Sequence, residues 1–190
     1  MKKIDVLKIS ALFCKVLYMI IVIVAIGTTV VFVHLQIDPQ YYHQWNASFL
    51  SQKAMLSYKV FERWNTDLAK EYTLLSLAKI SKMSLILNYL QVMGILSLIL
   101  FTIKEFSNVI ESVRSIETFH QKNTLSFRKM YKYLFIIFIL SSITIINAQE
   151  ANFYSYSLQL TPLTLSVAAL IMTEIFKQGN QLLEENKLTS

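Results

Sequence analysis

Four hydrophobic stretches with almost no charged side chains constrain this chain more than any other feature. The two cleanest run from Val16 to Val33 and from Met83 to Ile103. At about 1.5 Å per residue in a helix, the shorter one covers roughly 27 Å, close to the thickness of a bilayer core. A water-soluble domain would have to bury this surface, yet 54% of the residues are hydrophobic and only 16% are charged. We therefore expect an integral membrane protein.

The other two stretches are less uniform. Polar residues interrupt the third, from Tyr133 to Gln149, so we expect it to lie among other helices that satisfy those groups. The fourth follows Thr161-Pro162, a pair suited to a helix start. The sequence thus predicts an all-α fold, a single four-helix bundle in the membrane. Its predicted spans are about 12–35, 80–104, 132–149 and 158–177.

Three connecting segments complete the predicted domain of residues 1–190: an outer segment (36–79), an inner connection (105–131) and a tail (178–190). Apolar residues at near-helical spacing within 54–64 predict a helix on the outer membrane surface, so the extracytoplasmic segment between spans 1 and 2 is expected to be helical. The inner connection is expected to remain helical as well. Its apolar stripe consists of Phe106, Val109, Ile110, Val113 and Ile116.

The distribution of basic residues predicts the orientation. Of the 18 lysines and arginines, twelve fall on the side of the N terminus, the inner connection and the tail, and six fall on the outer side, in the 34–82 connection between the first two hydrophobic stretches. Cytoplasmic flanks of membrane spans are enriched in these residues. We expect a multi-pass plasma membrane protein with both termini in the cytoplasm.

Several classes of function have no support in the sequence. Cys14 is the only cysteine, and His34, His43 and His120 show no metal-binding spacing. The three glycines stand apart, so no phosphate-binding loop or nucleophile elbow is present. We therefore predict no catalytic residue, cofactor or metal. The net charge of +6 is explained by lysines and arginines beside the spans, where they meet the lipid bilayer, so direct nucleic-acid binding is not expected.

Polar residues within the predicted spans allow two interpretations each. Glu174 could couple to a proton or cation, because an intramembrane carboxylate is costly, or it could pair with Lys177 near the interface. Asn88 and Gln91 could line a pathway or form interhelical hydrogen bonds. A stripe of small residues in the fourth span could serve bundle packing or a homo-oligomer interface. That stripe consists of Ser166, Ala169 and Thr173.

Two cytoplasmic segments carry spaced positions that match a known pattern: Phe119, Asn123 and Arg128 in the inner connection, and Phe176, Gly179, Leu182, Glu185, Leu188 and Thr189 at the end of the chain. At these matching positions the chain resembles the bacterial DUF2975 family of membrane proteins. Chains of that family carry an F-x3-N-x3-LR signature before the third span and end in a span followed by a pattern like VFrrGxxLxeExdLTV. Phe127 stands where leucine is usual, and the outer segment resembles no known family.

The family has no established activity, and since the sequence offers no catalytic residue we expect a non-enzymatic protein. Genes of that family often lie beside one for a small helix-turn-helix regulator, so we expect the inner surface to bind such a regulator and to change its activity. The predicted docking residues are the matching positions from Phe119 to Glu185. An alternative function is a small transporter or an immunity factor against a membrane-active peptide, with Glu174, Asn88 and Gln91 on the pathway.

Overall fold

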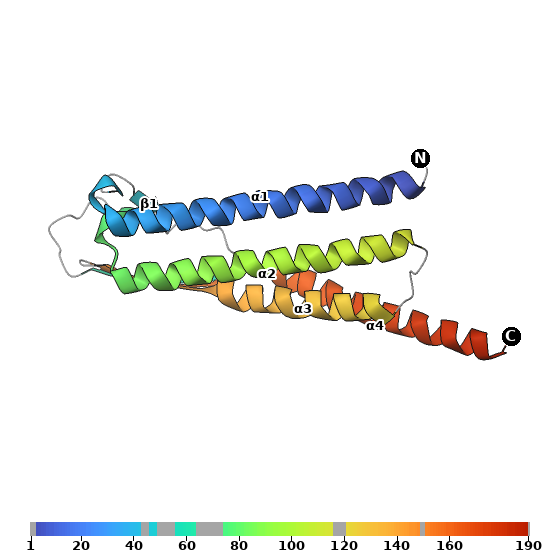
Figure 1. Cartoon of the computed structure of the whole chain (residues 1–190). Helices are drawn as coiled ribbons and strands as arrows, with labels where there is room; N and C mark the ends of the chain where they lie inside the picture. Colours follow the sequence, from blue (N-terminus) through green and yellow to red (C-terminus); the bar gives the residue numbers. More distant parts are fainter. Residues whose placement is uncertain are drawn as a thin grey trace. The chain divides into compact units, whose positions relative to one another are not determined.

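The computed structural model describes residues 3–42, 46–48, 56–63, 74–115, 121–148 and 151–189. Long α-helices dominate this part of the chain, with short strands between them (Figure 1). A short 3-10 helix, η1 (Gln40–Tyr42), follows the first helix, and another, η2 (Leu77–Lys79), precedes the second. The α-helices are α1 (Lys3–Ile37), α2 (Lys82–Arg114), α3 (Gln121–Ser142) and α4 (Leu160–Thr189).

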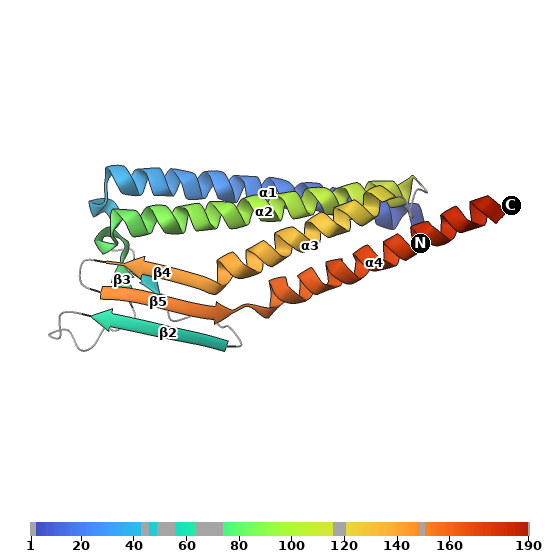
Figure 2. The ribbon, with the colours of Figure 1, turned by 90° about the horizontal axis from the view of Figure 1, so that it is seen from below.

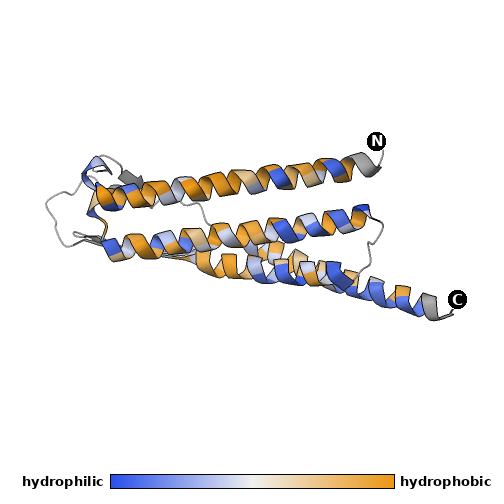
Figure 3. Ribbon diagram, viewed as in Figure 1, coloured by the Kyte–Doolittle hydropathy of each residue, from blue (hydrophilic) through white to orange (hydrophobic). Residues whose placement is uncertain are grey.

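Three of these helices are long and apolar enough to cross a membrane: Val6–Ile37, Lys82–Arg114 and Leu160–Glu185. Figure 3 shows that α1 is hydrophobic along most of its length, whereas the last turns of α4 are hydrophilic. Apolar side chains of α1 are largely exposed, at 62% for Ile9 and 64% for Met19 and Ile23. Water would oppose such exposure, and lipid would not. The chain thus has the helices of a membrane protein.

Helix α3 is not among these three, and the third predicted span, 132–149, is wrong in its second half. The helix ends at Ser142, and the chain continues as strand β4 (Ile143–Asn147). Three of the first four residues of this strand are isoleucines and the other is Thr144. Branching at Cβ restricts these side chains in a helix and suits them to a strand.

Four further strands lie in the described part of the chain: β1 (Asn46–Ser48), β2 (Leu56–Arg63), β3 (Leu74–Ser76) and β5 (Ala151–Leu158). Strands β1 and β3 form a small antiparallel pair. The other three form an antiparallel sheet in the order β2-β5-β4, which Figure 2 shows at the ends of α3 and α4. The all-α prediction therefore needs correction, although the fold is mostly helical.

The helix predicted within 54–64 is wrong, because Leu56–Arg63 is strand β2. The spacing of Tyr58 and Phe61 fits a helix, but Leu56, Tyr58 and Val60 also alternate with the period of a strand. Pairing with β5 decides between them: Tyr58 lies opposite Tyr156, and aromatic cross-strand pairs stabilise sheets. That partner is almost one hundred residues away, so local spacing could not reveal it.

The two faces of this sheet differ. On β5, Phe153, Ser155 and Ser157 are buried, each 3% exposed, whereas Tyr156 between them is 50% exposed. Phe153 forms a core cluster with Ile80 and with Ile146 of β4. One face of the sheet therefore packs on the start of α2, and the other presents aromatic and aliphatic side chains.

The chain divides into two compact units. Unit 1 is formed by the described residues of Met1–Ile23, Leu96–Phe138 and Thr161–Ser190, and unit 2 by those of Val24–Ile95 and Ile139–Leu160. Unit 1 thus contains the first part of α1, the second part of α2, most of α3 and almost all of α4. Unit 2 contains both sheets.

Candidate functional site

Polar side chains of α2 lie in unit 2 along the edge of strand β4. Ser84, Asn88 and Gln91 follow one another at spacings of four and three residues, so they share one face of the helix. Strand β4 pairs with β5 on one side only. Its other edge would leave backbone groups without partners, which is costly away from water. The three side chains of α2 lie at this edge.

The amide of Gln91 bridges the end of α3 and the start of β4. Its Nε2 donates to the carbonyl oxygen of Leu140 at 2.5 Å and to that of Ile143 at 2.7 Å. Leu140 is in the last turn of the helix, where carbonyls lose their intrahelical partners. Gln91 therefore satisfies the backbone at the point where the chain changes from helix to strand.

Asn88 and Ser84 continue the same pattern along β4. Asn88 Nδ2 donates to the carbonyl oxygen of Ile145 at 2.9 Å, and Ser84 Oγ donates to that oxygen at 3.3 Å. The backbone N–H of Asn147 donates to Ser84 Oγ at 3.0 Å. Asn88 and Gln91 thus hold the edge of the sheet by hydrogen bonds. This agrees with the hydrogen-bonding interpretation of these two residues, except that a strand takes the place of a helix as one of their partners.

Glu174 lies on an exposed part of α4 in unit 1. Its carboxylate is 3.5 Å from Lys177 Nζ, three residues further along the helix, and both side chains are 56% exposed. An exposed pair of this kind contributes little to stability. The position agrees with the interpretation of Glu174 as a paired residue near the interface.

A polar cluster in unit 1 joins α2 to α3. Asn123 is 1% exposed, and its Nδ2 donates to Ser112 Oγ at 2.8 Å. Glu105 accepts hydrogen bonds from Ser126 Oγ at 2.7 Å and from Lys129 Nζ at 2.9 Å. The hydrogen bond to the Glu105 carboxylate, together with its negative charge, raises the pKa of Lys129. These contacts fix the start of α3 against the end of α2.

The apolar core of unit 1 lies beside this cluster. The Phe127 and Phe176 rings are tilted to each other with centroids 5.0 Å apart. Val109, Met130 and Ala169 complete the buried cluster. Val109 belongs to the apolar stripe predicted for the inner connection, so that stripe packs in part inside the unit.

The small-residue stripe of α4 also faces inward. Ser166 is 1% exposed and Ala169 is 5% exposed. Ser166 Oγ donates to the carbonyl oxygen of Tyr131 at 3.4 Å, and Thr173 Oγ1 donates to that of Ala169 on its own helix at 2.8 Å. These contacts favour packing within the unit over an interface between copies. A homo-oligomer stays a prediction.

The residues predicted to dock a partner do not form one surface. Asn123 and Phe176 are buried, and Gly179 is half-buried, so these residues hold the helices together. Phe119, and with it the expected contact between Phe119 and Leu182, lies outside the described residues. The members whose side chains are exposed are Arg128, Leu182 and Glu185.

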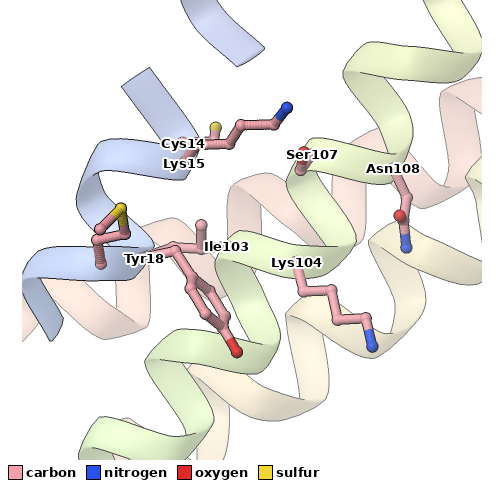
Figure 4. Close-up of a pocket in the computed structure, with 8 residues that line it drawn as sticks. Cys14, Lys15, Tyr18, Ile103, Lys104, Ser107 and Asn108 are labelled. Atoms are coloured by element: carbon pink, nitrogen blue, oxygen red, sulfur yellow. The ribbon is translucent and has the colours of Figure 1, made fainter. Parts of the chain in front are cut away.

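A cavity of about 480 Å³ lies in unit 1 between the first part of α1 and the second part of α2 (Figure 4). In the sequence, the two lysines that line this cavity lie next to the first two hydrophobic stretches: Lys15 precedes the first and Lys104 follows the second. The sequence does not show that they line one space, because that depends on how the helices pair. The lining residues are Cys14, Lys15, Tyr18, Met19, Ile103, Lys104, Ser107 and Asn108.

Metal ligands do not gather in the part of the chain that the structure describes, where no three His, Cys, Asp or Glu side chains could hold one ion. His34 is engaged through Nδ1, which is 3.0 Å from the hydroxyl of the buried Tyr42.

Comparison with known proteins gives no relative: no family model, curated protein or solved structure matches the chain. The resemblance of the inner segments to the DUF2975 pattern therefore stays a prediction.

Proposed function

We propose that the chain is a non-enzymatic bacterial plasma membrane protein that crosses the membrane four times, keeps both termini in the cytoplasm and binds a small helix-turn-helix regulator at its inner face. The third crossing is made by the apolar end of α3, and β4 follows it at the outer boundary of the membrane. This arrangement leaves the sheet and the rest of the 36–79 segment on the outer side, available to sense a peptide, a lipid or the state of the membrane.

One observation carries the proposal of an inner docking surface. Helix α4 continues to Thr189, beyond Lys177, through residues too polar for a bilayer core. In this extension Leu182 is 61% exposed and Leu183 is 42% exposed. Two exposed leucines on a polar helix suit the helix-in-groove mode of binding, in which apolar anchors enter a partner's groove.

Charge adds selectivity to this surface. Glu184 and Glu185 are exposed beside the leucines, and Arg128 is exposed on α3 of the same unit. Charged groups around an apolar anchor favour a partner of matching potential and discourage others. Many DNA-binding regulators carry a basic surface, which the glutamates would attract.

The alternative function, a small transporter or an immunity factor, gains no comparable support. Asn88 and Gln91 are engaged with backbone carbonyls in unit 2, and Glu174 pairs with Lys177 on an exposed surface of unit 1. No observation places the three groups along one path.

Replacing Leu182 with alanine is expected to reduce capture of the regulator about five- to tenfold, because removing an apolar anchor from an interface costs at least about 1 kcal/mol. The measurement is co-purification of the full-length tagged chain, from mild-detergent extracts of native membranes, with the regulator encoded beside it. Carbonate extraction checks that the variant remains inserted.

Gln181→Ala is the matched control, since Gln181 is the exposed neighbour of Leu182 and contributes no apolar anchor. It should retain full capture. If Leu182→Ala also retained full capture, or if the unaltered chain captured no such regulator, the proposed inner docking surface would be wrong.

A further inference from the structure

The cavity of unit 1 has a polar side built from two helices. Lys15 comes from α1, whereas Lys104, Ser107 and Asn108 come from α2. In Figure 4 the Lys15 side chain extends from α1, whereas the Lys104 and Asn108 side chains extend from α2 in a different direction, and the ring and hydroxyl of Tyr18 lie between the two helices. The Asn108 side chain is hydrogen-bonded to Glu105. The ammonium groups and the Ser107 hydroxyl donate hydrogen bonds and two of them carry positive charge, so this part of the lining suits an anion.

The two lysines are not committed elsewhere. Neither forms an ion pair or a side-chain hydrogen bond with any other residue in the described ranges. Glu105, the nearest acidic residue of α2 in sequence, is engaged by Lys129 and Ser126 from α3. The positive charges of Lys15 and Lys104 are therefore available to a ligand.

The other side of the cavity is apolar. Met19 lies one turn after Lys15 on α1, and Ile103 immediately precedes Lys104 on α2. Lys15 precedes the hydrophobic stretch 16–33, and Lys104 follows the stretch 83–103, so both lysines mark the point where a span meets the membrane surface. The lining thus changes from cationic to apolar in the direction in which a bilayer changes from headgroups to acyl chains.

We propose that this cavity binds an anionic phospholipid, with the headgroup attracted by the charges of Lys15 and Lys104 and an acyl chain lying along Met19 and Ile103. Basic pockets between membrane helices commonly select anionic headgroups. A volume of about 480 Å³ is within the range of small-ligand sites and admits a headgroup with the first part of a chain. Free phosphate shares the anionic chemistry but would leave the apolar side empty.

The test measures lipid binding to the full-length chain in mild detergent. Native mass spectrometry counts bound phosphatidylglycerol, with phosphatidylcholine as the zwitterionic lipid and inorganic phosphate as a competitor. The double variant Lys15→Gln/Lys104→Gln is expected to bind phosphatidylglycerol about 30-fold more weakly, since each lysine near an anionic surface contributes a factor of roughly five. The variant Lys8→Gln/Lys132→Gln removes the same charge from two exposed lysines that do not line the cavity.

Three results support the site together: preference for phosphatidylglycerol over phosphatidylcholine, a loss of less than about twofold in the control variant, and no displacement by millimolar phosphate. Equal losses in the two double variants would mean that the lysines act only through net charge, and would overturn the proposal. So would equal binding of both lipids. Displacement by inorganic phosphate would show that the cavity takes the free anion instead of a lipid.

Discussion

Replacing Phe176 with alanine is expected to lower the free energy of unfolding by about 3 kcal/mol, the largest effect we expect from a single substitution. The ring is 8% exposed and packs on Phe127 in the core of unit 1. Its removal leaves a space lined by residues from α2, α3 and α4, which cannot all close on it. Unfolding by sodium dodecyl sulfate in mixed micelles, followed by circular dichroism, measures the change.

Ile175→Ala is the matched control, because Ile175 precedes Phe176 on the same helix and is 50% exposed. It should change the free energy of unfolding by less than about 1 kcal/mol, since an exposed side chain leaves no internal cavity. Equal effects of the two substitutions would contradict the described core. The comparison also bears on the proposed docking surface, because the burial of Phe176 gives this predicted docking residue a role in packing.

Replacing Gln91 with leucine is expected to destabilise the chain by about 2 kcal/mol. The substitution keeps a side chain of similar size but removes both hydrogen bonds to the carbonyls of Leu140 and Ile143. A carbonyl that loses its hydrogen-bond partner away from water costs about 1–3 kcal/mol. The same unfolding measurement applies.

Gln181→Leu serves as the control for a loss of polarity on an exposed helix.

A second test combines Gln91→Leu with Asn88→Leu. Both side chains hold the same strand edge, so the loss in the double variant should be smaller than the sum of the two single losses. If Gln91→Leu were neutral or stabilising, the edge of β4 would not depend on α2.

The helices that depend on local properties are predicted well from the sequence. Long charge-free stretches identify α1, α2 and α4, because a bilayer requires about twenty apolar residues in one segment. The helical structure expected for the 105–131 connection is confirmed in its described parts, because α2 continues to Arg114 and α3 begins at Gln121. Each of these features is set by residues that are neighbours in the sequence.

The sheet could not be predicted in the same way. Strand β2 pairs with β5, and β4 lies against α2, so the structure of each segment depends on a distant partner. The Ile143–Ile146 run of β-branched residues was a usable signal for β4, but its hydrophobicity also fits a span. Tertiary pairing overrides local spacing at these positions.

The same distinction applies to the candidate site: contacts within one helix could be predicted from the sequence, and contacts between helices could not. Ion pairing of Glu174 with Lys177 could be foreseen, because it depends on a spacing of three residues within one helix. The burial of Asn123 could not, because it requires Ser112 of a second helix. The cavity lined by Lys15 and Lys104 likewise appears only when α1 and α2 are seen together in unit 1.

The most direct test of the account is the side of the membrane on which its segments lie. Single cysteines at Ser57 and Ser115, on a Cys14→Ser background, place one probe at an exposed residue of β2 and one just after α2. A cysteine probe at Ser155 of the neighbouring strand β5 would be unsuitable, because this position is only 3% exposed. With an impermeant maleimide, the account predicts that Ser57→Cys reacts in intact cells and that Ser115→Cys reacts only after permeabilisation. Reaction of both probes in intact cells, or the reverse pattern, would contradict it.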